Sequence, residues 1–229
     1  MCSSDLGVET EADRVTAVTG TTLDPLTDRP AGTFRVRARA FVLAGGAVGS
    51  PRFLLANGLS DGPVGEHLHI HPTAGMVARF AEEVVPWEGV TQGYYVDRWW
   101  EGFLLQTFSM PPDQYFVSMP LQGDDLLAFM RDLRQYASAG TVVHDEDSIG
   151  AVTATGLTYH LGDLDRGRIL AGLRATAEVF FAAGAVEVIP GVHGTGRMTS
   201  LADVRLALSD DVPAWDIGLY ASQIGRAHV

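Results

Sequence analysis

The amino-terminal part of the chain carries an apolar and polar pattern that predicts strands. Residues 8–18 read as a short strand and residues 33–44 as a longer one, in which apolar and polar positions alternate before the apolar run Phe41-Val42-Leu43-Ala44. The stretch between them, residues 23–32, is rich in Pro, Asp and Gly, which is the chemistry of a hairpin loop. We therefore expect two strands that lead into an apolar strand end.

A glycine turn follows at residues 45–49, after which the pattern becomes helical. Ser50 is expected to be the N-cap, and Pro51 suits the first helical position. Gly58 can end the helix in the left-handed conformation. The predicted unit is a strand, a glycine turn and a helix.

Residues 73–119 read as aromatic-rich strands of an antiparallel sheet, separated by glycines and by Pro111-Pro112. By default this aromatic stripe is core, and a sheet so rich in Trp and Tyr can also form the apolar wall of a substrate pocket. The aromatic positions are Trp87, Tyr94, Tyr95, Trp99, Trp100, Phe103, Phe108, Tyr115 and Phe116.

The remaining pattern alternates helices and strands. Residues 141–143 and 151–159 read as strands joined through a solvated acidic turn, Asp145-Glu146-Asp147-Ser148. Helices are expected at three places: from Asp124 or Asp125 through Tyr136 to a stop at Gly140, from Asp163 to Ala183 with Gly184 as its stop, and from Thr199 or Ser200 with Asp203 placed for a capping contact.

Charge and composition narrow the classes of function. The formal net charge is −12, and all 16 cationic residues are Arg. A chain this acidic is not expected to bind nucleic acid or anionic membranes, and the absence of Lys excludes Schiff-base and P-loop lysines. No apolar run reaches the roughly 18–20 residues of a membrane helix. Because Cys2 is the only cysteine, no intramolecular disulfide can form. We expect a soluble, cytoplasmic protein.

The glycine turn is one candidate site. A strand that ends in glycine and opens a helix can cradle a phosphate, because small residues let the backbone approach and the helix N-terminus offers N–H donors. Gly45, Gly46, Ala47 and Ser50 fit that mechanism. The spacing is not G-x-G-x-x-G, and the local pattern alone favours a tight packing turn over a ligand site.

The densest histidine cluster is a weaker candidate. On a strand, His67, His69 and His71 would share one face, an arrangement that can bind a divalent metal. With no cysteine or matching acidic motif nearby, these residues are interpreted as structural, and we predict no metal site. His144, His160 and His193 stand alone and receive no role.

Both ends of the chain are expected to be foreign. Residues 1–6 and the last six residues can be encoded by DNA that matches a common short-read sequencing adapter and its reverse complement. The adapter would also supply part of codon 223, so residues 223–229 are expected to be adapter-derived. On this interpretation Gly7 to Ser222 are an internal fragment of a longer chain.

Two segments resemble the glucose–methanol–choline (GMC) family of flavoprotein oxidoreductases. Residues 37–59 resemble the family's second signature region, an apolar strand, A-G-A, two residues, S-P and a Leu-rich helix, although here an extra glycine enters the turn and Asn57 replaces the usual Ser. Residues 64–72 resemble V-G-x-N-L-x-x-H-P, with His67 in place of Asn. The L-H-I-H-P form leans toward the branch of long-chain alcohol oxidases.

The resemblance implies an α/β fold in which a fragment of an FAD-binding, Rossmann-like domain carries an inserted α+β substrate domain of antiparallel sheet and helices. Residues 7–72 would belong to the FAD domain, 73–192 to the substrate domain, and 193–222 to the return toward the catalytic region. Leu219-Tyr220-Ala221-Ser222 resembles the approach to the family's S-H-x-M-G motif, which suggests that Gln223 replaces a His.

The resemblance also implies the chemistry. Ala44, Gly45, Gly46, Ala47, Ser50 and Pro51 would line an FAD cofactor. The parent enzyme would oxidise a small-molecule, apolar alcohol, such as a fatty, aromatic or steroid alcohol, by hydride transfer to the flavin. A His base outside this fragment would take the hydroxyl proton, so no catalytic residue is assigned here. The 229-residue chain by itself is expected to be inactive. The alternatives are another two-domain flavoprotein oxidoreductase and a non-catalytic binding module.

Overall fold

The computed structural model describes residues 6–226, with side chains described up to residue 221. Nearly all of the two expected adapter-derived stretches lies outside the described side chains, so that expectation stays a prediction. Within the described part the chain forms two compact units. The first comprises residues 6–69, 149–160 and 224–226, and the second comprises residues 70–148 and 161–223.

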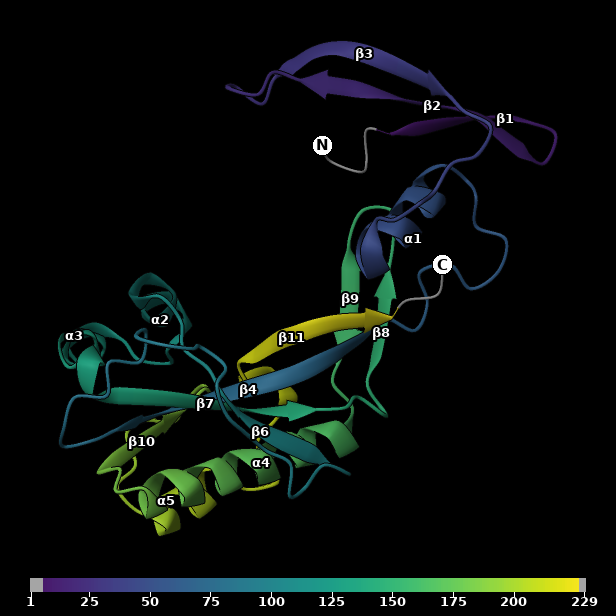
Figure 1. The fold of residues 1–229 in the computed structure, drawn as a ribbon. Helices are drawn as coiled ribbons and strands as arrows, with labels where there is room; N and C mark the ends of the chain where they lie inside the picture. The colour runs from purple at the N-terminus through teal and green to yellow at the C-terminus, as the bar shows by residue number, and fades with distance from the viewer. Residues whose placement is uncertain (1–5, 227–229) are drawn as a thin grey trace. The chain divides into compact units, whose positions relative to one another are not determined.

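The first unit contains a three-stranded antiparallel sheet in the order β1-β2-β3 (Figure 1), from Gly7–Glu11, Arg14–Leu23 and Pro30–Arg37. The single strand predicted over residues 8–18 is wrong, because the chain reverses at Ala12 and Asp13. Ala12 has a φ of 52°, the left-handed conformation that tight hairpin turns require. Neither turn residue is the Gly or Asn that signals such a turn, so the sequence pattern hid it.

The predicted strand end at residues 41–44 is also absent. Strand β3 stops at Arg37, and no described residue pairs with residues 41–44. Val42 is 90% exposed. A strand needs a neighbour for its backbone N–H and C=O groups, and apolar character alone does not supply one.

Helix α1 spans Gly46–Ala56, so it begins before the predicted N-cap. Ser50 and Pro51 lie inside the helix, and Gly45 is the N-cap. Gly58 has a φ of 68°, which confirms the predicted left-handed residue after the helix. The unit is completed by a hairpin of β8 (Ile149–Val152) and β9 (Leu157–His160), so the single strand predicted over residues 151–159 is wrong.

The second unit is built on an antiparallel sheet whose strands are not in sequence order. The order is β10-β4-β7-β6-β5, and β11 also pairs with β4. The strands are β4 (His69–Arg79), β5 (Tyr95–Val96), β6 (Phe103–Thr107), β7 (Tyr136–Val143), β10 (Glu187–Pro190) and β11 (Leu219–Arg226). The predicted antiparallel sheet is therefore present.

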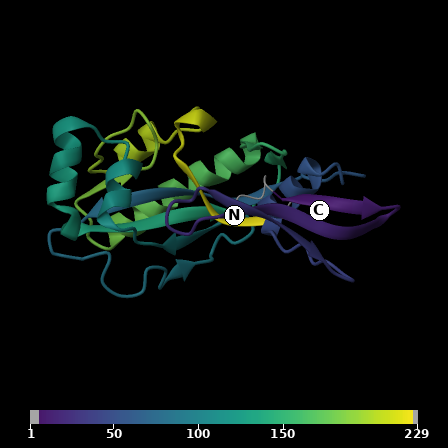
Figure 2. The same cartoon turned by 90° about the horizontal axis from the view of Figure 1, so that it is seen from above.

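Helix α4 (Asp163–Ala182) contacts β6, β7 and β10 and so covers one face of this sheet (Figures 1 and 2). Its bounds confirm the predicted helix, and Gly184 beyond it has a φ of 96°. The short helix α5 (Leu201–Ala207) packs on α4. Ser200 caps α5 by accepting a hydrogen bond from the Asp203 N–H at 3.1 Å, as predicted.

The opposite face carries α2 (Pro112–Ser118) and α3 (Gly123–Arg131) at one end. They contact each other and enclose an apolar cluster of Val77, Tyr115, Leu121, Phe129, Leu133, Tyr136 and Ile189. Tyr115 and Phe116 thus lie on a helix and not on the predicted strand. The predicted helix over residues 124–136 is too long, because a 3-10 turn (Leu133–Gln135) and then β7 follow α3.

A buried polar cluster ties three strands of the sheet together. The Tyr136 hydroxyl donates to Glu187 Oε1 at 2.7 Å, Arg79 Nε lies 3.2 Å from the same oxygen, and Arg197 also pairs with Glu187. Burial, together with the Glu187 carboxylate, raises the pKa of Tyr136 to about 12. Burial opposes ionisation of Glu187, but the Tyr136 hydroxyl and the two guanidinium groups outweigh it and hold its pKa below 4.5.

Candidate functional site

The six predicted cofactor residues lie in one turn at the start of α1. The Ser50 hydroxyl accepts a hydrogen bond from the Gly45 N–H at 3.0 Å, and the Gly49 N–H donates to the Gly45 carbonyl at 3.1 Å. A Cβ on Gly45 would stand 2.9 Å from the Ser50 nitrogen, so only glycine fits there. Gly46 has a φ of 71°, which also favours glycine.

The outer side of this turn is open. Ala44, Gly45 and Gly46 are exposed, whereas Ser50 and Pro51 are buried. Gly46 and the next two residues are the first of the helix, so their N–H groups have no acceptor within it. The turn therefore satisfies both interpretations of the sequence: close packing explains Gly45, and an accessible helix N-terminus could hold a phosphate.

The β8–β9 hairpin braces this part of the first unit. The Leu68 N–H donates to the Gly150 carbonyl at 2.9 Å, and the Val152 N–H donates to the Gly65 carbonyl at 2.7 Å. Arg52 of α1 reaches the hairpin turn and donates to the Ala154 carbonyl at 3.0 Å. Helix α1 is thus tied to a segment that lies about a hundred residues further along the chain.

A second candidate site is an apolar pocket of about 220 Å³ in the second unit. It lies on the sheet face opposite α4 and is lined by Thr73, Gln92, Gln106, Phe108, Ser109, Met110, Gly140, Val142 and Tyr220. Residues of one parity on each strand share this face, because side chains alternate along a strand. The side chains of Thr73, Gln92, Gln106, Ser109 and Tyr220 add polar groups to a mostly apolar lining, as in pockets for small molecules.

One wall of the pocket, residues 108–110, is held in place by hydrogen bonds to Ser138 and Tyr115. The Phe108 N–H donates to the Ser138 carbonyl at 3.2 Å, and the Ser138 hydroxyl donates back to the Phe108 carbonyl. Tyr115 lies behind them, with its hydroxyl 2.6 Å from Ser138 Oγ, and it also accepts from the Met110 N–H at 3.4 Å. Tyr115, the buried residue of α2, therefore supports the pocket wall.

The aromatic stripe divides among the core, the walls of pockets and the exposed surface. Among its members Tyr115 is buried, but Tyr94 is 80% exposed and Trp100 is 73% exposed. Phe108 lines the pocket of about 220 Å³. Trp99 stacks on Phe103 with ring centroids 5.4 Å apart, and both line a wider groove beside α4. Aromatic content alone did not distinguish these positions.

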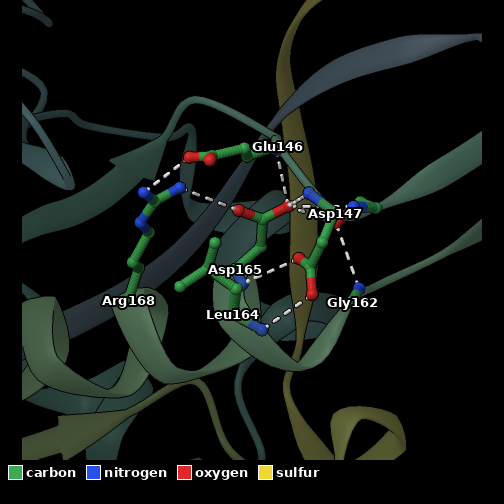
Figure 3. Close-up of polar contacts among 7 residues, drawn as sticks. Glu146, Asp147, Gly162, Leu164, Asp165 and Arg168 are labelled. Carbon is green, nitrogen blue, oxygen red and sulfur yellow. Dashed lines mark hydrogen bonds and ion pairs between the residues drawn. The ribbon is translucent and has the colours of Figure 1, made fainter.

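The sequence predicts that the acidic turn at residues 145–148 is solvated, but in the structure this turn packs against the start of α4. Asp165, in the first turn of α4, is fully buried, and its Oδ2 accepts the N–H groups of Glu146, Asp147 and Ser148 and the Ser148 hydroxyl (Figure 3). Arg168 bridges Asp165 and Glu146. Because these donors satisfy the carboxylate, the cluster is a structural clasp.

Asp147 completes the clasp from the other side. Its carboxylate accepts the Leu164 N–H at 2.9 Å and the Asp165 N–H at 3.1 Å, which caps the start of α4 (Figure 3). Burial opposes ionisation of Asp147, but these two N–H groups outweigh it and hold its pKa below the ordinary 3.8. Sequence reasoning missed this clasp. The acidic residues Asp163 and Asp165 at the start of α4 were the signal that could have pointed to it.

The histidines do not form the one-sided array considered from the sequence. His67 has a φ of 55° and precedes β4, which begins at His69, so the three alternate histidines do not share a strand. His71 contacts His144 edge-to-face, with ring centroids 6.2 Å apart. Among the described residues, no group of three or more His, Cys, Asp or Glu side chains is arranged to hold a metal ion.

Comparison with known proteins identifies relatives. An uncharacterized GMC-type oxidoreductase of Mycobacterium tuberculosis, found in two strains, is 33% identical over 185 residues, which cover 77% of this chain. The chain is homologous to the GMC-type oxidoreductases. Two proteins of Arabidopsis thaliana named long-chain-alcohol oxidases, FAO3 and FAO4B, are 26% and 28% identical over 69% and 68% of the chain.

This homology confirms the resemblance to the GMC family. No protein-family model matches the chain. The aligned region spans 29% of the length of the M. tuberculosis GMC-type protein and 22–23% of the two plant oxidases. In the described part of this GMC homologue, no helix is long and apolar enough to cross a membrane.

Proposed function

We propose that this chain is part of a flavin-dependent oxidoreductase that acts on the CH–OH group of an apolar alcohol. The observation that carries the proposal is the homology over 185 residues to a GMC-type oxidoreductase, joined by two relatives named as alcohol oxidases. The homology favours an enzyme over a non-catalytic binding module. The apolar pocket on the sheet of the second unit supports an apolar substrate.

The residues that would hold FAD are Ala44, Gly45, Gly46, Ala47, Ser50 and Pro51. They fit a cofactor phosphate, because the turn is exposed, carries no Cβ at two positions and opens the N-terminus of α1. Ser50 would act indirectly, since its hydroxyl already accepts the Gly45 N–H and so fixes the turn. When bound, FAD would supply the acceptor for a hydride.

The chain's own residues would bind and orient the alcohol. The carbon chain would lie on the sheet face between Phe108, Met110 and Val142, where burial excludes water. Gln106 and Ser109 could orient a polar end by hydrogen bonding. The base that takes the hydroxyl proton would be a His outside residues 7–222, so no described residue is assigned that role.

The test is expression of the longest open reading frame that contains residues 7–222. We expect the purified protein to carry flavin absorbance that bleaches anaerobically on addition of n-heptanol and not of glucose. A flavin-free protein, or a flavin that no alcohol reduces, would overturn the proposal. The isolated 229-residue chain is expected to retain little flavin. Alcohol-driven flavin reduction by that chain would show that the proposed His base outside residues 7–222 is not needed.

A further inference from the structure

Two glycines face each other across neighbouring strands beside the pocket, and one of them, Gly140, belongs to its lining. In the antiparallel register Gly75 of β4 is the partner of Gly140 of β7, and Thr73 is the partner of Val142. Both pairs lie on the face opposite α4, since positions two residues apart share a face. The glycine pair leaves a flat patch without side chains beside the Thr73–Val142 pair.

The Phe108 ring occupies that patch. A Cβ on Gly75 would stand 2.9 Å from Phe108 Cζ, and nothing except this ring would lie within 4 Å of it. A Cβ on Gly140 would stand 3.2 Å from Phe108 Cε1. The ring therefore rests directly on both backbones, in the space that two missing methyl groups leave.

The ring cannot shift easily as a body, because its backbone is hydrogen bonded to Ser138 through both its N–H and its carbonyl. Ser138 is buried and backed by the Tyr115 hydroxyl. With the ring seated, the pocket measures about 220 Å³. Pockets that bury drug-sized ligands measure about 300–1,000 Å³, so this one suits a slender group.

We propose that Phe108 is a specificity-determining residue whose ring sets the depth of the substrate pocket, so that unbranched alcohols enter and alcohols with a ring next to the carbinol carbon are excluded. The inference rests on the proposed function, because it assigns the pocket to the alcohol. It goes further by placing the selection on one side chain and by separating slender from bulky apolar alcohols.

A purely structural role for Phe108 makes a different prediction. Aromatic rings can compensate for glycines in a sheet by covering them, and such a ring would affect stability alone. Under that view, shortening Phe108 would lower the melting temperature and leave the preference between alcohols unchanged. Selectivity, and not stability, therefore separates the two roles.

The experiment compares n-heptanol with cyclohexylmethanol, which has the same number of carbons, as reductants of the flavoenzyme that contains this chain. In Phe108→Ala and Phe108→Leu we expect the ratio of kcat/KM for cyclohexylmethanol to that for n-heptanol to rise by about tenfold or more, the scale on which pocket shape discriminates. Phe116→Leu, an aromatic change on the exposed side of α2, is the matched control and should leave the ratio unchanged.

Gly75→Ala supplies the opposite change. Its added methyl meets only the Phe108 ring, so the ring should be pushed into the pocket and kcat/KM for n-heptanol should fall. The double variant Gly75→Ala with Phe108→Ala should recover activity. If the wild type oxidises alcohols and the Phe108 variants keep its ratio of kcat/KM for cyclohexylmethanol to that for n-heptanol, this inference alone is overturned. If the wild type oxidises no alcohol, the proposed function is overturned.

Discussion

At the scale of single residues, Gly45 at the N-cap of α1 and Gly49 in the first turn of that helix have opposite surroundings. A Cβ on Gly45 would press on the Ser50 nitrogen at 2.9 Å, whereas a Cβ on Gly49 would meet nothing within 4 Å. In the flavoenzyme that contains this chain, Gly45→Ala should therefore lower the flavin-to-protein ratio, because the turn must open. Gly49→Ala is the matched control and should retain flavin like the wild type. Equal flavin content in both variants, measured by absorbance, would exclude a role for this turn in cofactor binding.

Asp165 offers a second prediction at this scale. Replacing it with Ala removes the acceptor of three backbone N–H groups and the Ser148 hydroxyl. The free energy of unfolding should fall by about 3–5 kcal/mol, because buried donors would be left unsatisfied and Arg168 would lose a partner. Asp163→Ala, in the same helical turn but with a side chain that is 95% exposed, should cost less than about 1 kcal/mol. Denaturant titration of both variants gives the comparison.

Glu187 predicts how stability depends on pH. Its pKa in the folded chain is below 4.5, so its contribution is present above that pH and is lost as the pH falls through the lower, folded value. Glu187→Gln should therefore be less stable than the wild type by about 3 kcal/mol at neutral pH, since two guanidinium groups lose their counter-charge. The difference should shrink below pH 4.5. A difference that stays constant from neutral to acidic pH in denaturant titrations would contradict this assignment.

Single residues also show where sequence reasoning ends. Gly58 and Gly184 were predicted correctly, because a left-handed residue after a helix leaves a local signal. The pocket was not predictable in the same way, since Gly75, Gly140 and Phe108 come together only once the register of β4, β7 and the chain after β6 is known. The clasp around Asp165 also depends on partners nearly twenty residues away.

At the scale of elements, the seating of α4 on the sheet rests on one small residue. A Cβ on Gly172 would lie 2.1 Å from Thr141 Cγ2, so Gly172→Ala should push α4 away from β7 and destabilise the chain by about 1–3 kcal/mol. Gly167→Ala in the same helix meets nothing within 4 Å and should stabilise it by about 0.5–1 kcal/mol. Thermal melts of the two variants should shift in opposite directions, and a shift in the same direction would show that α4 does not pack this closely.

Elements with their own boundary residues were predicted well, and those that depend on distant partners were not. Helix α4 has acidic residues in its first turn and a glycine after its end, and both bounds agree with the prediction. Tyr136 continues the helical spacing of α3 but lies on β7, because pairing with β4 and contact with Phe129 outweigh local preference. The prediction of a strand at residues 41–44 is wrong for a different reason: the local pattern favours a strand, but no described strand lies beside it to pair with.

At the scale of the whole molecule, the two compact units differ in how much each buries. In the first unit's three-stranded sheet Ala17 is the one buried residue, whereas β4 of the second unit is buried continuously from Pro72 to Ala78. Local opening costs little where few apolar contacts are lost. Amide hydrogens of β1 to β3 should therefore exchange at least about tenfold faster than those of β4 and β7. Equal protection in the two sheets, measured by hydrogen exchange with mass spectrometry, would contradict this expectation.

The β8–β9 hairpin belongs to the first unit although residues 70–148 separate it from the rest of that unit. During synthesis the loop around Gly65 and the Arg52 side chain must wait for their partners until the ribosome has made residues 149–160, when β10 and β11 of the second unit's sheet are still to be made. Contacts between stretches so far apart form late and slowly, because a long loop must close first. Both units are therefore expected to mature late, because the second unit in turn needs α4 and β10, which are made after the hairpin.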